Sequence, residues 1–271
     1  MTTIVAFGDI MGRPGRVALA KALPAVRKQY NPDFLIINGE NAAGGYGLSK
    51  KIFKFFIEDL GIDCITMGNH WHDNREIFEI LGHTEKIVLP GNMSNVNDEK
   101  SGVRMFKSRD GQNIAVSNLI GRVFMKGDNR CPFKTADRLQ SEISALCKIR
   151  VVDMHAEASS EKQALGRYLG SRVSLFYGTH SHVPTADDRI IDQHTGYVTD
   201  LGMTGGYDSV IGVDTKAAIH RMLFQEKKDF KPSPDDPWVC FVVAKVDPGT
   251  GACQSLDRYR WELKRMDFLD S

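Results

Sequence analysis

The chain has 271 residues, 42% hydrophobic and 25% charged, which is typical of a globular protein large enough to bury a full core. Lys and Arg number 35 against 34 Asp and Glu, so the near-neutral charge argues against binding duplex nucleic acid through its phosphates. No apolar run reaches the roughly 18 residues of a membrane span. The five scattered cysteines form no Cys-x-x-Cys pair, so we expect a cytoplasmic protein with reduced thiols and no membrane segment.

The first half of the chain repeats one pattern, in which a short apolar strand is followed by a polar loop and a helix. Strands are predicted over residues 4–7, 34–37 and 64–67, with helices near 17–30, 49–60 and 73–81. A fourth strand is predicted over residues 87–89. Such repeats predict an α/β fold with a largely parallel sheet.

The second half mixes hairpins with further strand–helix units. Strands are predicted over 103–107 and 113–116 as a hairpin, over 149–155, and over 173–176. Hairpins are also predicted over 189–200 and 238–259, and helices over 135–148, 160–169 and 215–224. The chain shows no internal repeat and no linker, so we expect a single domain spanning residues 1–271.

Polar side chains follow three successive strands of the first half. Asp9 comes just after the first strand, Glu40 and Asn41 follow the second, and Asn69 follows the third. From the pattern alone, Asp9 is equally compatible with capping a turn, and Glu40-Asn41 with a flexible turn. In open α/β sheets, however, ligands bind outside the carboxyl ends of the strands, so the repetition favours a binding site.

Histidines follow two strands of the second half. His155 ends one predicted strand, and His180-Ser181-His182 follows another. Residues two apart on an extended chain project from the same face, about 6.5–7 Å apart. The His-x-His pair is therefore able either to share one metal ion or to supply one ligand to each of two ions.

These strand-end residues together form a candidate metal site. Three imidazoles, two carboxylates and two amides suit two divalent ions such as iron, manganese or zinc better than calcium or magnesium. Two such ions about 3.5–4 Å apart polarise phosphoryl oxygens and hold a hydroxide in line with the leaving group. The candidate ligands are Asp9, Glu40, Asn41, Asn69, His155, His180 and His182.

The same motifs resemble those of the calcineurin-like metallophosphoesterases, and more closely those of the bacterial YmdB-type subfamily. Most metallophosphoesterases carry Asp-x-His in the first motif and a bridging aspartate. Here no histidine follows Asp9, and Glu40 followed by Asn41 is similar to the subfamily's variation. The resemblance covers nearly the whole chain through Gly8-Asp9-x-x-Gly12, Asn38-Gly39-Glu40-Asn41, Gly68-Asn69-His70, His155 and Gly178-Thr179-His180-Ser181-His182.

The resemblance implies a four-layer α/β/β/α sandwich and a phosphodiesterase acting on 2′,3′-cyclic nucleotides by attack of a metal-bridging hydroxide. It implies iron or manganese as the metals, with zinc as an alternative, and a homo-oligomer. His70 becomes the acid that assists the leaving oxygen. By the same resemblance, Asp9, Glu40, Asn41 and His182 hold one metal, and Glu40, Asn69, His155 and His180 hold the other.

Two other functions are compatible with the same motifs. One is a phosphomonoesterase of the same fold, because fold does not fix the substrate. The other is a regulatory protein that binds a cyclic nucleotide without hydrolysing it, although an acid such as His70 beside two metals favours an enzyme. Two features carry no assigned role: the additional His72 and the polar loop Arg122–Pro132.

Overall fold

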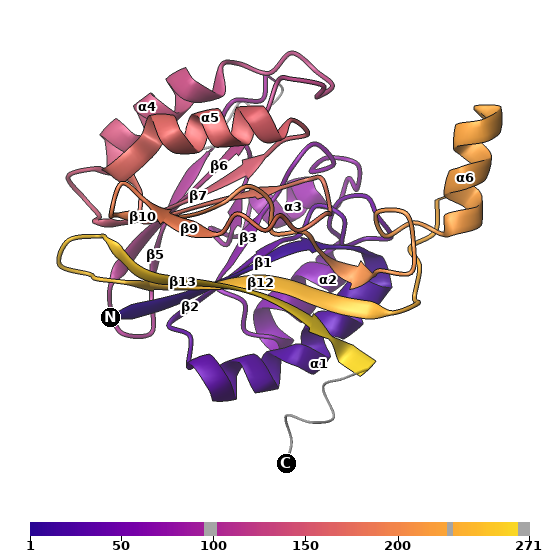
Figure 1. Cartoon of the computed structure of the whole chain (residues 1–271), viewed down its shortest axis with the longest axis horizontal. Coiled ribbons are helices and arrows are strands. Elements are labelled where there is room, and N and C mark those ends of the chain that lie inside the picture. Colours follow the sequence, from indigo (N-terminus) through magenta and orange to yellow (C-terminus); the bar gives the residue numbers. More distant parts are fainter. Residues whose placement is uncertain (95–101, 227–229, 265–271) are drawn as a thin grey trace.

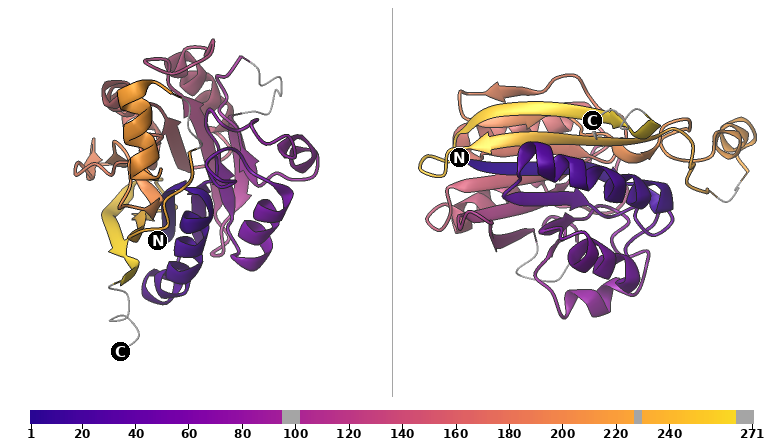
Figure 2. Two further views of the ribbon diagram at one scale, coloured as in Figure 1. Left: turned by 90° about the vertical axis from the view of Figure 1, so that its right-hand side faces the viewer. Right: turned by 90° about the horizontal axis from the view of Figure 1, so that it is seen from below.

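Two β-sheets packed face to face form the centre of the protein, with helices covering their outer faces (Figure 1). The computed structural model describes residues 1–94, 102–226 and 230–264. Figure 2 shows the two sheets from the edge, with helices outside each of them. The predicted four-layer α/β/β/α arrangement is confirmed.

The first sheet has seven strands in the order β13-β12-β11-β1-β2-β3-β4. Its inner strands run parallel, as the strand–loop–helix repeats predicted, and the closing hairpin β12–β13 lies antiparallel at one edge. The strands are β1 (Thr2–Ile10), β2 (Phe34–Asn38), β3 (Cys64–Thr66), β4 (Ile87–Val88), β11 (Met203–Gly206), β12 (Pro237–Val246) and β13 (Cys253–Glu262).

The second sheet has six strands in the order β5-β6-β7-β8-β10-β9. Its four central strands are parallel, and the antiparallel strands β5 and β9 form the edges. The strands are β5 (Val103–Lys107), β6 (Asn113–Ile120), β7 (Ile149–His155), β8 (Leu175–Thr179), β9 (Arg189–Ile191) and β10 (Thr195–Val198).

Alternation of side chains along the strands separates three apolar layers. In β1 every residue is buried, because both faces of the sheet are covered. Ile4 and Ala6 face the second sheet, whereas Val5 and Phe7 face helix α1 (Gly12–Tyr30). The helices α2 (Lys50–Lys54) and α3 (Ile77–Leu81) also cover the first sheet, and α4 (Pro132–Ile143) and α5 (Ser159–Leu169) cover the second.

Several element boundaries differ from those predicted. β1 continues beyond Phe7 to Ile10, because Asp9 and Ile10 pair with β11, a strand nearly 200 residues later in the chain. β8 likewise continues to Thr179 alongside β7. The predicted helix over 49–60 begins regularly at its Ser49 cap and then widens into a π-helical turn over Phe55–Asp59. The predicted helix over 135–148 begins earlier, at Pro132, and ends at Ile143.

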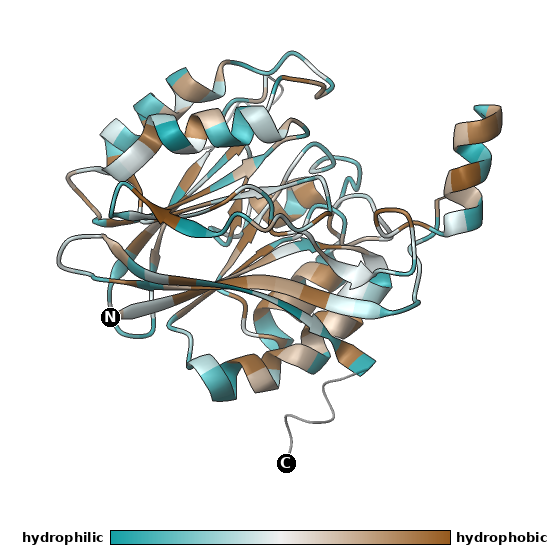
Figure 3. Ribbon diagram, viewed as in Figure 1, coloured by the Kyte–Doolittle hydropathy of each residue, from teal (hydrophilic) through white to brown (hydrophobic). Residues whose placement is uncertain are grey.

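Helix α6 (Thr215–Phe224) extends away from the rest of the molecule (Figures 1 and 2). Ala218 is its only buried residue, and Met222, Leu223 and Phe224 are 73%, 69% and 62% exposed. In Figure 3 the projecting helix carries hydrophobic stretches. Within the described part of the chain, none of the helices combines the length and apolar character that crossing a membrane requires.

Candidate metal centre

The parallel strands of both sheets end at the same edge of the molecule, on the right in Figure 1, and the predicted ligands meet there. Asp9 lies within β1, and His155 is the last residue of β7. The others follow strand ends: Glu40 and Asn41 after β2, Asn69 after β3, and His180 and His182 after β8. Of the seven, all but Asn69 and His180 are almost completely buried.

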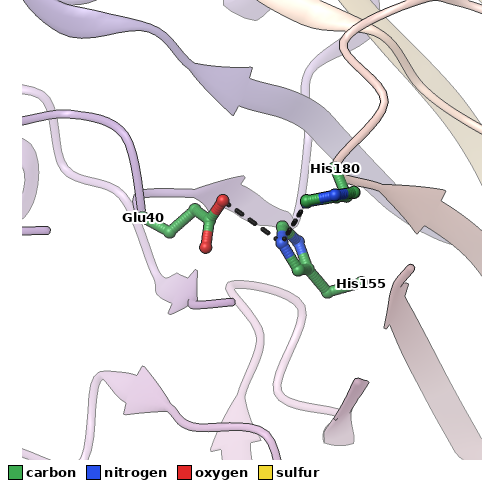
Figure 4. A group of neighbouring side chains, drawn as sticks. All are labelled: Glu40, His155 and His180. Atoms are coloured by element: carbon green, nitrogen blue, oxygen red, sulfur yellow. Dashed lines mark hydrogen bonds and ion pairs between the residues drawn. The ribbon is translucent and has the colours of Figure 1, made fainter. Parts of the chain in front are cut away.

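Four of these residues form a first cluster around the ring of His155, and Figure 4 shows three of them, Glu40, His155 and His180. His155 Nε2 lies 3.2 Å from Glu40 Oε1, 3.0 Å from Asn69 Oδ1 and 3.0 Å from His180 Nδ1. The carboxylate, the amide oxygen and the two ring nitrogens therefore converge on one small volume.

The remaining three residues form a second cluster beside the first. His182 Nε2 lies 3.2 Å from Asn41 Oδ1 and 3.9 Å from Asp9 Oδ1. Asp9 Oδ2 accepts the backbone N–H of His180 at 3.2 Å, which joins the two clusters. Asp9 Oδ1 is buried and has no hydrogen-bond partner among the described residues. Asp9 therefore caps no turn, and one of its oxygens is available to a ligand.

Hydrogen bonds outside the clusters fix the tautomer of each histidine. Thr179 donates its hydroxyl proton to Asp153 at 2.7 Å, so it accepts the Nδ1–H of His155 at 2.9 Å. His182 Nδ1–H donates to the carbonyl oxygen of Ile211 at 2.8 Å. With Nδ1 engaged in this way, Nε2 of each ring faces the oxygens of its cluster.

His180 follows the same rule with its nitrogens exchanged. Its Nε2 lies 3.1 Å from Glu157 Oε2, so Nδ1 carries the lone pair that faces His155. Nε2 of His155 thus faces a carboxylate oxygen, an amide oxygen and the lone pair of His180, three acceptors that need a proton or a metal ion between them. The donor set of imidazole nitrogens and carboxylate and amide oxygens fits divalent transition metals. Outer hydrogen bonds of this kind orient metal-binding histidines in proteins.

Burial and charge shift the pKa values of the two acidic residues in opposite directions. Burial raises the pKa of Asp9 to about 6, although His182 and His155 oppose the shift. Burial also acts to raise the pKa of Glu40, but the charge of His155 and its hydrogen bond outweigh it, and the pKa falls to about 2. Glu40 is thus held as a carboxylate, and a cation next to Asp9 would favour its charged form as well.

The loop that carries both histidines after β8 is strained and held in place by a buried ion pair. His180 and His182 have φ angles of 96° and 63°, values that non-glycine residues rarely adopt. Asp200 accepts the backbone N–H of Ser181 at 3.3 Å and pairs with Lys162 at 2.5 Å, and both charged residues are 1% exposed. The surrounding structure therefore imposes the positions of the two rings.

His70 lies at the open side of the first cluster. Its backbone N–H donates to Glu40 Oε2 at 3.1 Å, and its Nδ1 lies 2.7 Å from Asp73 Oδ2. The ring is partly exposed and contacts the edge of Tyr46, with 5.1 Å between ring centroids. Nε2 of His70 has no hydrogen-bond partner among the described residues and is able to meet a substrate. His72, in contrast, is exposed and contacts Trp71.

Several residues of this site were not predicted. Asp73 stands three residues after its partner His70, and this short spacing was a usable signal, whereas Glu157 contacts His180, which lies on a different loop. Asp153 was recognised only as part of a strand. The Ile211 carbonyl and the Lys162–Asp200 pair belong to distant segments, and no local pattern marks them.

Gly68 is required by the packing of the first cluster, so the Gly68→Ala variant should lose metal. A Cβ there would lie 2.3 Å from both Glu40 Oε2 and His155 Nε2, which forces these ligands apart. We expect at least about 10- to 100-fold weaker Mn²⁺ binding, the range found when residues supporting metal ligands are changed. Elemental analysis and Mn²⁺ titration measure it.

Gly82→Ala is the matched control, because its Cβ would meet nothing closer than Glu79 O at 3.6 Å. Full metal content in Gly68→Ala would show that the ligands do not occupy these positions when metal is bound.

Comparison with known proteins identifies the family. Residues 5–259 match the family model of the YmdB-like proteins. The chain belongs to this family. It is 40% identical over 255 residues to the 2′,3′-cyclic-nucleotide 2′-phosphodiesterase of Bacillus subtilis (strain 168). The aligned residues make up 94% of this chain and 95% of that protein.

Solved structures agree with this YmdB-like assignment. The crystal structure of a novel phosphatase from Mycoplasma pneumoniae has a TM-score of 0.88 at 29% identity, covering 99% of this chain and 98% of that one. The calcineurin-like phosphoesterase YfkN of B. subtilis has a TM-score of 0.54 at 10% identity over 97% of this chain and 91% of that one, which shows a shared fold. The predicted family and the prediction of a phosphoester-hydrolysing enzyme are confirmed. The fold and the Glu40–His155–His180 cluster imply divalent metal ions.

Proposed function

We propose that this YmdB-like protein is a phosphodiesterase that uses two divalent metal ions, iron or manganese, to hydrolyse 2′,3′-cyclic nucleotides. The observation that carries the proposal is the convergence of three histidine ring nitrogens on carboxylate and amide oxygens at one edge of the sheets. The activity named for the B. subtilis relative supports the choice of substrate.

We assign the two clusters to one metal ion each. Glu40 Oε1 lies with His155 in the first cluster, and we propose that the carboxylate of Glu40 also reaches the second ion as the bridge. Bound there, the ions would polarise the phosphoryl oxygens and lower the pKa of a bound water. The first ion would be held by Glu40, Asn69, His155 and His180, and the second by Asp9, Glu40, Asn41 and His182.

The residues of the chain then supply binding, orientation and a proton. We propose that His70 Nε2 gives a proton to the 2′ or 3′ oxygen as it leaves phosphorus. Asp73, 2.7 Å from Nδ1, stabilises the protonated ring and fixes its orientation. The buried pair of Lys162 and Asp200 holds the histidine loop, so that ligand positions are set before substrate binds.

The substrate assignment is tested with manganese-loaded protein on 2′,3′-cyclic AMP, bis(p-nitrophenyl) phosphate and p-nitrophenyl phosphate. We expect metal-dependent turnover of both diesters and much slower turnover of the monoester. Faster turnover of the monoester would identify a phosphomonoesterase instead. Tight binding of cyclic nucleotide without any turnover would identify a regulatory binding protein.

The proposal includes the setting of the enzyme. We propose a single-domain enzyme of the cytoplasm that acts on a small substrate, because four of its five free cysteines are buried thiols of the kind kept reduced there. Cell fractionation checks the location, and recovery with the membrane or secreted fraction would contradict it.

We also propose that the chain forms a homo-oligomer through α6. A ten-residue helix that buries only Ala218 is marginal in water, and Met222 and Phe224 expose large apolar side chains on it. Light scattering should give a multiple of the chain mass for the natural protein and the mass of one chain for the Met222→Asp/Phe224→Asp variant. Leu146→Asp, at an exposed apolar residue in the turn after α4, is the control. A natural protein that is monomeric would contradict the proposal.

A further inference from the structure

The loop after β6 presents one aromatic ring to solvent in a strained conformation. Phe124 is 86% exposed, more than any other large hydrophobic residue in the described part of the chain. Its φ angle is 62°, which is a genuine outlier for a bulky residue. Such strain persists only where the surroundings determine it, and it concentrates at functional sites.

The turn that carries Phe124 is held firmly by buried groups. Glu161, 8% exposed, accepts the backbone N–H groups of Arg122 at 3.0 Å and Val123 at 3.2 Å. The N–H of Met125 bonds back to the carbonyl of Arg122 at 3.3 Å. Phe124 is therefore exposed because hydrogen bonds hold the turn in this conformation, and not because the loop is disordered.

This turn lies beside the metal centre. Ile120 pairs in register with His155, and the N–H of Gly121 donates to the carbonyl of His155 at 2.9 Å. Met125 packs against the apolar cluster that contains Trp71, two residues after Asn69. Phe124 is four residues after Ile120, so even a fully extended chain places their Cα atoms no more than about 14 Å apart.

We propose that Phe124 is a specificity-determining residue that stacks on the nucleobase of the substrate, which rests on the function proposed above. An aromatic ring accepts the π-face of any base, and a ring already fixed in place loses little entropy on binding. The surroundings argue against a protein partner here. Val123 is the only other exposed large hydrophobic residue of the turn, and Arg122 and Lys126 are exposed two residues before and after Phe124, so charged side chains border the apolar surface.

The test compares substrates with and without a base. Manganese-loaded Phe124→Ala and Phe124→Gly should raise KM for 2′,3′-cyclic AMP about 5- to 100-fold, the range expected for the loss of one stacked base. Both should leave kcat/KM for ribose 2′,3′-cyclic phosphate unchanged. Phe124→Trp should keep the natural KM. Phe124→Gly should also be at least as heat-stable as the natural protein, because glycine relieves the left-handed strain. Leu146→Ala, at the opposite edge, is the control.

A readout without turnover separates this inference from the proposed function. The extra tryptophan fluorescence of Phe124→Trp, relative to the natural protein, should be quenched by adenosine 3′-monophosphate but not by ribose phosphate. If the fluorescence is quenched but neither cyclic substrate is hydrolysed, the base-binding role of Phe124 is supported and the proposed phosphodiesterase function is refuted. Equal KM changes for both substrates, or the absence of quenching, would overturn the role of Phe124. So would a change of oligomeric state with unchanged KM.

Discussion

The Glu40→Ala variant is expected to lose tight binding of both metal ions and at least about 10³-fold in kcat/KM. Glu40 is the only predicted ligand assigned to both ions, so removing it affects two sites at once. A metal ion that polarises a phosphoryl oxygen contributes several kcal/mol, and each 1.36 kcal/mol is a factor of ten in rate. Elemental analysis after reconstitution with Mn²⁺, together with turnover of 2′,3′-cyclic AMP, measures the result.

Glu40→Gln and Glu142→Gln make this experiment specific. Glu40→Gln keeps the shape and one oxygen but removes the charge that faces His155 at 3.2 Å, so we expect weaker metal binding than in the natural protein. Glu142 is on the exposed face of α4 and pairs with Arg138, so Glu142→Gln should change neither metal content nor rate. A Glu40→Ala protein that still holds two ions and turns over substrate would contradict the bridging role.

The His70→Ala variant is expected to keep its metals and lose about 10²- to 10⁴-fold in kcat, the range for removal of a general acid. His70 contacts the cluster through its backbone N–H, which alanine retains, whereas its ring points to the open side and pairs with Asp73. A substrate with a p-nitrophenolate leaving group should be much less affected, because that group leaves without a proton. The difference between the two substrates isolates proton donation.

His72→Ala is the matched control for His70→Ala. His72 stands two residues away, is exposed, and contacts Trp71 rather than the cluster. We expect its kcat to stay near that of the natural protein. Loss of metal from His70→Ala would make His70 a structural residue, and equal loss of rate with both substrates would show that its ring donates no proton.

The sequence predicted that these polar side chains lie close together, because they follow strand ends. A run such as residues 34–37 is apolar enough to be a buried strand, and parallel strands must place their ends at one edge. Polar groups after three such runs therefore share one edge of the first sheet, and histidines after two more share one edge of the second. That the two edges coincide follows from the packing of the sheets. The separation of His180 and His182 into two clusters needed the resemblance, since the spacing alone allowed one ion or two.

What local patterns do not contain are the contacts between distant segments. The tautomer of His155 depends on Thr179 and Asp153, which read as ordinary strand residues. The extension of β1 through Asp9 depends on pairing with Met203. The left-handed backbone of His180 is imposed by its surroundings, because no local preference of histidine favours a φ of 96°.

The most direct test of the two-metal account is a crystal structure of manganese-loaded protein with anomalous scattering measured at the manganese edge. The account predicts two peaks about 3.5–4 Å apart with Glu40 between them. His155 and His180 should contact one peak, and His182 and Asp9 the other. A single peak, or peaks away from this edge of the sheets, would contradict it.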